Sequence, residues 1–206
     1  MSNVKRLTLI IFGLVTCYLI VLPQLPGLAK SEPISQKSSQ LKVTYDKANN
    51  ETTESIPLRT VMEVPGTIEV QTPHGTRKLP SETLQMAAYF SYPGRTFVRP
   101  ADVMLAFLAV VQDEAKYKNT DEVVVRVDSQ SLSVGKLHVA DQSIDTNMPL
   151  KDVNYWRQTF EVSIKAPEFL RLANGRKVTV KLGNTEFDLS AEQIKLLRAL
   201  ATRVGA

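Results

Sequence analysis

The stretch VMLAFLAVV, residues 103–111, decides the fold class because apolar side chains occupy both of its alternating faces. A strand with one solvated face carries a polar residue at every second position, so a strand with two apolar faces must be covered on both sides. Periodicity alone also permits a buried helix, but the β-branched and aromatic neighbours favour a strand. Residues 103–111 are therefore expected to form a central strand of a sheet.

Short segments of alternating apolar residues precede this strand, and turn residues separate them at intervals of about ten. These segments are 41–45, 58–64, 68–70 and 84–90. We expect Pro65-Gly66 to make a tight turn between the second and third segments, and Tyr92-Pro93-Gly94 to end the fourth.

Similar segments follow the central strand, at 123–127, 132–134, 137–139, 155–164, 178–182 and 187–189. Residues 128–131 and Gly183-Asn184 suit hairpin turns, Gly135-Lys136 suits a bulge, and a loop is expected from 140 to about 153. The whole pattern predicts a mostly β protein that folds as an antiparallel β-sandwich.

Two helices are predicted near the C-terminus. Pro167 suits a first helical turn, and Asn174-Gly175 ends this short helix before the last hairpin. Ser190 and Gln193 form a capping box that starts a C-terminal helix over 191–203. The apolar stripe of this second helix must be buried, and the strand 103–111 is its expected packing surface.

The N-terminus has the layout of a secretory signal: a basic start, an apolar run over 7–22 and small residues at Gly27-Leu28-Ala29. We expect cleavage after Ala29. Alternatives are an uncleaved membrane anchor over 7–22 or a lipoprotein whose lipidated residue is Cys17. The domain prediction is a signal at 1–29, a Ser-rich flexible tether at 30–40 and a single β-sandwich domain with its C-terminal helix at 41–206.

Charge and cysteine content exclude several functions. The chain has a net charge of +4, but loss of Lys5 and Arg6 with the signal leaves 23 of the 25 basic residues against 21 acidic ones. This near-neutral balance does not indicate nucleic-acid binding, although the C-terminal face keeps a mild basic excess.

Cys17 is the only cysteine, so a chain cleaved after Ala29 has no thiol for catalysis or metal binding.

The sequence contains no recognisable catalytic motif, and we expect no cofactor and no metal. His74 and His138 stand alone, His74 in a turn and His138 pointing outward from a strand. Acidic pairs, Asp113-Glu114 and Asp121-Glu122, flank a loop, and carboxylate pairs of this kind can bind calcium or act in a glycosidase, but the Asp-x-Asp-x-Asp-Gly spacing of a calcium loop is not present. Interleaved lysines favour a simply solvated loop instead.

A candidate binding surface comes from four residues that are expected to be exposed: Tyr89, Tyr92, Tyr155 and Arg157. Exposed tyrosines beside arginine stack well on sugars and on partner proteins. Trp156, on the apolar side of the same strand as Tyr155, is expected in the core. The candidate surface favours a non-catalytic module that serves protein interaction or structure. Carbohydrate or small-ligand binding is the alternative. A carboxylate-dependent hydrolase is the least favoured hypothesis.

Three parts of the sequence carry a resemblance: Phe90-Ser91-Tyr92-Pro93-Gly94, the strand Val123–Asp128 and the run from Val178 through Arg198. Together they resemble small exported bacterial β-sandwich proteins. The resemblance covers about residues 56–204. It implies export to the periplasm or the cell exterior and a β-sandwich fold, and it brings no catalytic residue. An envelope protein or a glycan is the expected partner, with membrane contact limited to an uncleaved N-terminal segment.

Overall fold

The structure is a computed structural model that describes residues 41–72, 75–145 and 153–206. The described residues all belong to one unit. The predicted signal at 1–29 and the tether at 30–40 lie outside the described residues, as does His74. None of the described helices is long and apolar enough to span a membrane.

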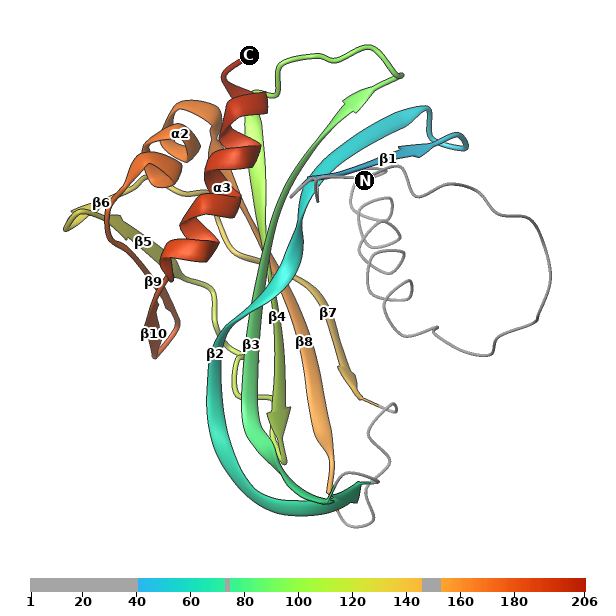
Figure 1. The fold of residues 1–206 in the computed structure, drawn as a ribbon, viewed down its shortest axis with the longest axis vertical. Helices are drawn as coiled ribbons and strands as arrows, with labels where there is room; N and C mark the ends of the chain where they lie inside the picture. Colours follow the sequence, from blue (N-terminus) through green and yellow to red (C-terminus); the bar gives the residue numbers. More distant parts are fainter. Residues whose placement is uncertain (1–40, 73–74, 146–152) are drawn as a thin grey trace. The chain divides into compact units, whose positions relative to one another are not determined.

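Two sheets of antiparallel strands and two helices make up the described unit, so the predicted mostly β, sandwich-like fold is confirmed (Figure 1). The larger sheet has the order β1-β2-β3-β4-β8-β7, with β1 at Lys42–Asp46, β2 at Glu51–Thr72, β3 at Gly75–Pro93, β4 at Asp102–Gln112, β8 at Tyr155–Lys165 and β7 at His138–Ile144. The smaller sheet has the order β10-β9-β5-β6, with β10 at Thr185–Asp188, β9 at Val178–Leu182, β5 at Val123–Val127 and β6 at Gln130–Ser131.

Strand β4 occupies the interior position that its two apolar faces predict. It pairs with β3 on one side and with β8 on the other. Val103, Leu105 and Phe107 are fully buried on one face, and Ala106 and Leu108 are buried on the other. The expected central strand is confirmed.

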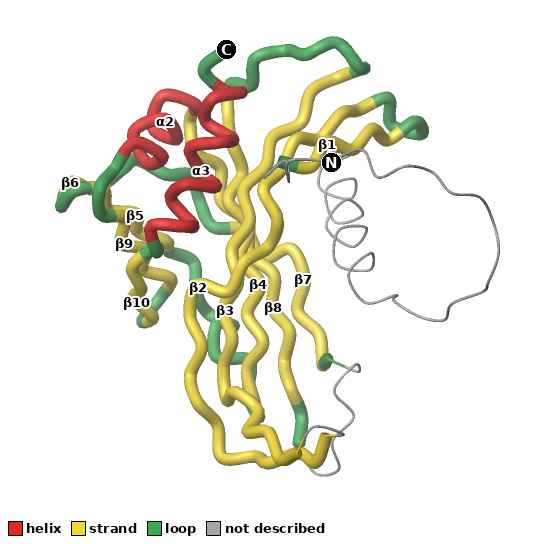
Figure 2. Tube along the Cα trace, in the orientation of Figure 1, coloured by secondary structure: helices red, strands yellow, loops and turns green. Residues whose placement is uncertain are grey.

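The predicted tight turn at Pro65-Gly66 is wrong, because β2 continues through it to Thr72 and pairs with β3 as one long hairpin. The pairing register shifts on both sides of Pro65. A Cβ atom on Gly66 would lie 2.2 Å from the carbonyl oxygen of Leu79, so the two backbones approach each other closely here. Proline and glycine thus create an irregularity inside the hairpin, and both strands bend along their length (Figure 2).

Two further loop predictions need correction. The β5–β6 hairpin turns on Asp128 and Ser129 alone, both with left-handed backbone at φ 49° and 72°. Positive φ at both central residues is what a type I′ hairpin turn requires, and it is reached here without glycine. The predicted loop from 140 is wrong up to Ile144, because β7 continues to that residue beside β8.

The helices form where predicted. Helix α2 spans Ala166–Asn174 with proline in its first turn, and α3 spans Ala191–Val204 with the Ser190–Gln193 capping box intact. The packing surface of α3 differs from the prediction. It contacts α2, β2 and β3, while α2 is the helix that contacts β4 and β8. Figure 2 shows both helices beside the smaller sheet.

The larger sheet has two distinct faces. One face packs with the helices and the smaller sheet to form the main core. The other face, called the second face below, carries Tyr89, Ala106, Leu108 and Tyr155, which are buried but are not part of that core. The two apolar faces of 103–111 predict that β4 is covered on this side, whereas Tyr89 and Tyr155 of the neighbouring strands were expected to be exposed. The burial of this face therefore matters for the candidate site.

Candidate functional site

The tyrosine surface predicted from the sequence is not exposed. Tyr89, Tyr92 and Tyr155 are 4%, 6% and 1% exposed, and Arg157 is half-buried. Tyr155 of β8 pairs with Gln112, the last residue of β4. Its hydroxyl donates a hydrogen bond to the carbonyl oxygen of Pro80 in β3 (3.2 Å). The prediction of exposure is therefore wrong for all three tyrosines, and Trp156, predicted in the core, is half-buried.

Two of these tyrosines bind buried glutamates, and a third tyrosine, Tyr117, does the same. The first pair joins β3 to β2, where the Tyr92 hydroxyl donates to Glu54 (3.0 Å). Arg203 of α3 donates two hydrogen bonds to the same carboxylate, at 2.7 and 2.8 Å, and its guanidinium lies over the ring of Phe97. Glu54 therefore attaches the last turn of α3 to the larger sheet.

The second pair attaches the β4–β5 connection to both sheets. The hydroxyl of Tyr117 donates to Glu82 of β3 and lies 3.0 Å from the hydroxyl of Thr185 in β10. Lys116 donates to the same glutamate at 2.6 Å. The backbone N–H of Tyr117 donates to the side-chain oxygen of Gln158 in β8, so this segment is held at three points.

The third pair lies on the second face. Tyr89 of β3 donates to Glu161 of β8 at 2.9 Å, and Glu161 is 1% exposed. His138 is the cross-strand neighbour of Glu161 in β7 and is exposed, as predicted. Among the described residues, no lysine or arginine forms an ion pair with Glu161, in contrast to the other two glutamates.

This difference appears in the pKa values. Hydrogen bonds from Arg203 lower the pKa of Glu54 below its ordinary value despite burial. Burial raises the pKa of Glu161, and Tyr89 and His138 offset this only in part. Burial and the adjacent glutamate also raise the pKa of Tyr89 and of Tyr117. Glu54 is thus held as a carboxylate, whereas the site of Glu161 favours the neutral acid.

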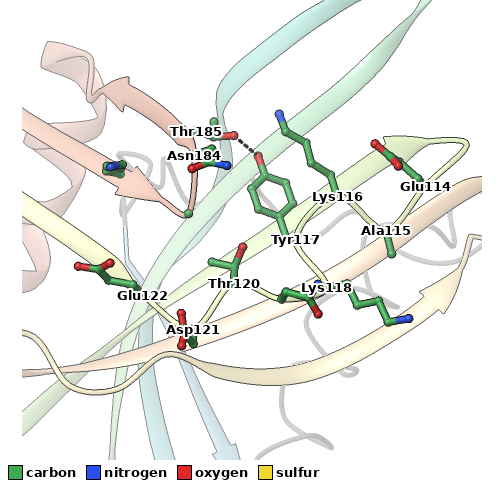
Figure 3. A pocket seen from close by; sticks show the side chains of 13 residues that line it. Glu114, Ala115, Lys116, Tyr117, Lys118, Thr120, Asp121, Glu122, Asn184 and Thr185 are labelled. Atoms are coloured by element: carbon green, nitrogen blue, oxygen red, sulfur yellow. Dashed lines mark hydrogen bonds between the residues drawn. The ribbon is translucent and has the colours of Figure 1, made fainter.

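The loop singled out by its acidic pairs borders a cleft of about 590 Å³, and the turn between β9 and β10 forms the opposite wall (Figure 3). The walls are fixed relative to each other, since the Gly183 N–H donates to the carbonyl oxygen of Glu122 (3.3 Å). Gly183 has a φ of +56°, and a Cβ there would lie 2.7 Å from the Thr120 hydroxyl, so another residue would strain the backbone and displace the Thr120 side chain. Figure 3 shows Tyr117 below Thr185, with its hydroxyl directed toward it.

Three of the four predicted carboxylates, Glu114, Asp121 and Glu122, line this cleft, and Asp113 does not. Lys118, Lys181 and the amides of Asn119 and Asn184 line it as well. Within the described ranges, no three acidic, histidine or cysteine side chains gather as a metal ion would require. The cleft is therefore polar and of mixed charge, and its carboxylates are interleaved with cations and amides.

Apolar exposure is concentrated at the edges of the larger sheet. In the described part of the chain, five large apolar side chains are exposed: Val43, Val64, Val98, Val139 and Ile144. Val43 lies on edge strand β1, and Val139 and Ile144 lie on edge strand β7. An edge strand also presents unpaired backbone N–H and C=O groups, so these strands can bind a further strand.

Sequence reasoning missed all three buried glutamates. Glu161 has the polar position of an alternating strand, which ordinarily indicates solvent, whereas Glu54 and Glu82 lie on the core face opposite Phe90 and Val111. Their tyrosine partners lie 38, 35 and 72 positions away, and cross-strand register rather than local spacing brings them together. A usable signal was the parity of Glu54, which shares the core face with Ile56.

No protein-family model matches the chain, and no curated protein is similar to it at a significant level. Function must therefore be argued from the residues themselves.

Proposed function

We propose that the protein is an exported, non-catalytic interaction module of the cell envelope or the cell exterior. The observation that carries the proposal is the position of the exposed apolar side chains, three of which lie on the edge strands β1 and β7. Such edges are usually short, charged or covered, since they otherwise pair with other chains. Export is inferred from the basic and apolar pattern of residues 1–29.

The buried polar groups support a non-catalytic role. Glu54 and Glu82 each bind a tyrosine and a basic side chain from another element, which is a structural use of the carboxylate. A catalytic acid or base must instead reach a substrate within hydrogen-bond distance. The contacts of these two glutamates hold α3 and the β4–β5 connection in place.

Photo-crosslinking in the source cells tests this function. The full chain would carry a photoreactive phenylalanine at Val139, at Val43 or, as a control, at the exposed Lys195 of α3. We expect one discrete protein adduct from an edge position and none from position 195. Identical adduct patterns from all three positions, or no protein adduct at either edge, would contradict the proposal.

The cleft beside Tyr117 favours a second function, binding of a small polar ligand. Its walls are fixed by the Tyr117 and Gly183 contacts and offer hydroxyls, amides and both charges. Tyr117 itself is 1% exposed, so it offers no ring for a sugar to stack on. A ligand would be held by hydrogen bonds and charge alone.

A thermal-shift screen of monosaccharides, amino acids and short peptides tests this alternative, with Lys181→Ala and Asn184→Ala as cleft variants. Stabilisation that both variants abolish would support it. The same screen, extended to glycoside hydrolysis, tests the least favoured hydrolase hypothesis on Glu114, Asp121 and Glu122.

A further inference from the structure

The four sheet edges differ in length, and β7 is the longest. The larger sheet ends at β7 with seven residues and at β1 with five, and the smaller sheet ends at β10 with four and at β6 with two. Strand addition gains affinity from consecutive backbone hydrogen bonds. Strand β7 is therefore the edge best suited to it.

The hydrogen-bond pattern identifies which backbone groups of β7 face outward. The N–H of Asp145 donates to the carbonyl oxygen of Tyr155 (2.7 Å), so Asp145 directs its backbone groups toward β8. The register is continuous from Asp141 to Ile144, and antiparallel pairs alternate between inward and outward bonding. Gln142 and Ile144 consequently direct their N–H and C=O groups away from β8.

Side chains on the two faces of β7 differ in chemistry. Val139 and Ile144 lie opposite Phe160 and Trp156 on the core face, and they are 38% and 46% exposed. Gln142, opposite Gln158, lies between them on the same face, so the apolar core reaches the edge of the sheet at two positions that a polar pair separates. A bulge at Ala140 restricts regular pairing to the segment that follows it.

The second face of β7 carries charge. Asp141 lies opposite Thr159 and accepts a hydrogen bond from Ser143 at 3.3 Å. Within the residues that the structure describes, Asp141 forms no ion pair with a lysine or arginine. A basic side chain on an added strand would lie beside it, and opposite charges on adjacent strands stabilise pairing.

We propose that the partner is an extended segment of another protein that pairs with β7 at Gln142 and Ile144, covers Val139 and Ile144 with apolar side chains and places a lysine or arginine beside Asp141. This inference rests on the proposed interaction function and specifies its surface. The segment alternates apolar and polar residues, since its two faces continue the two faces of β7.

Selection from a displayed library of random ten-residue peptides on the full-length protein tests this. Gln142→Pro removes the outward N–H, whereas Gln142→Ala removes the side chain and keeps that donor. Both variants should unfold at nearly the wild-type temperature, because this N–H does not pair with β8. Selected peptides should bind Gln142→Pro at least about tenfold more weakly and Gln142→Ala almost normally.

The charge is tested separately by selecting on Asp141→Lys. We expect basic residues to be enriched on the wild type and acidic residues to replace them on this variant. Equal binding of the selected peptides to Gln142→Pro and Gln142→Ala would overturn the proposal for β7. The proposed interaction function would survive that result, because the crosslinking scan also tests an interaction elsewhere on the chain. A wild-type dimer by sedimentation that Gln142→Pro dissociates would show that a second copy occupies the edge, and would also overturn it.

Discussion

Arg203 and Glu54 are 149 positions apart in sequence, and two hydrogen bonds of 2.7 and 2.8 Å join them. Glu54 is 1% exposed, and the pKa of this carboxyl is held below its ordinary value by those bonds. A buried charge without its partner is strongly destabilising. This pair therefore makes the stability of the sheet depend on the last turn of the C-terminal helix.

Arg203→Met should lower the free energy of unfolding by about 3 kcal/mol at neutral pH, because it leaves the Glu54 carboxylate buried without a cation. Urea unfolding measures the change. Lys195→Met, on the exposed side of the same helix, is the matched control and should change stability by less than about 0.5 kcal/mol. The double variant Glu54→Gln/Arg203→Met should recover part of the loss, and a fully additive double variant would show that the two side chains are not coupled.

Tyr117→Phe should destabilise the protein by about 1–2 kcal/mol, since the buried Glu82 loses a hydrogen-bond donor and keeps only Lys116. Trypsin should also cleave faster at Lys116 and Lys118, because the segment is released from the sheet. Tyr45→Phe removes a hydroxyl that binds Asn50 at an exposed site, so it serves as the control. Unchanged cleavage in Tyr117→Phe would mean that the other contacts of this segment suffice to hold it.

Glu54→Gln and Glu161→Gln should change the pH dependence of stability in opposite directions. The pKa of Glu54 is lowered, so its contribution is present above the ordinary glutamate pKa and is lost as pH falls through the lower folded value. Glu54→Gln should therefore be destabilising at neutral pH and nearly neutral in strong acid. Urea unfolding across the acid range, measured beside the wild type, gives the comparison.

Burial raises the pKa of Glu161, so the native state holds a proton that the unfolded chain has already released. Stability is then lost as pH rises from the ordinary glutamate pKa toward the raised value. Glu161→Gln should remove this loss and be at least as stable as the wild type at neutral pH. A marked destabilisation of Glu161→Gln at neutral pH would show that the ionised carboxylate is needed on the second face.

Deletion of residues 190–206 should abolish cooperative unfolding, because α3 contributes Ile194, Leu197 and Leu200 to the main core. Deletion of Gly205-Ala206 alone is the control, as it keeps every apolar side chain of α3 and removes two carbonyl contacts of Arg99 and the two N–H bonds that end the helix. Calorimetry distinguishes the outcomes. A sharp transition near the wild-type temperature in the longer deletion would make α3 an appendage.

The alternation of side chains was sufficient to predict most elements of this fold. Residues 103–111 predicted a central strand and Ser190 with Gln193 predicted a helix start, because both signals are local. Pro65-Gly66 misled because the same pair that makes a turn also permits an irregular strand, and only the partner strand decides between them. Local sequence carries no information on that choice.

The candidate site was harder to predict for the same reason. Alternation placed Tyr89 and Tyr155 correctly on the face opposite the core, but within their own strands it indicated solvent, although the two apolar faces of 103–111 predicted that β4 is covered there. The partner of Tyr89 on this face, Glu161, is brought to it by cross-strand register, which local alternation does not show. The edge role of β7 likewise depends on the order of strands in the sheet, which is a global property.

The bond between Glu54 and Arg203 also has a consequence for biogenesis. A ribosome makes Glu54 149 residues before Arg203, so the growing chain lacks, until α3 has been made, the cation that this carboxylate needs in the folded core. Helix α3 also supplies apolar side chains to the main core. Stable folding of the larger sheet should thus wait until α3 has emerged, and strand pairing made earlier should remain reversible.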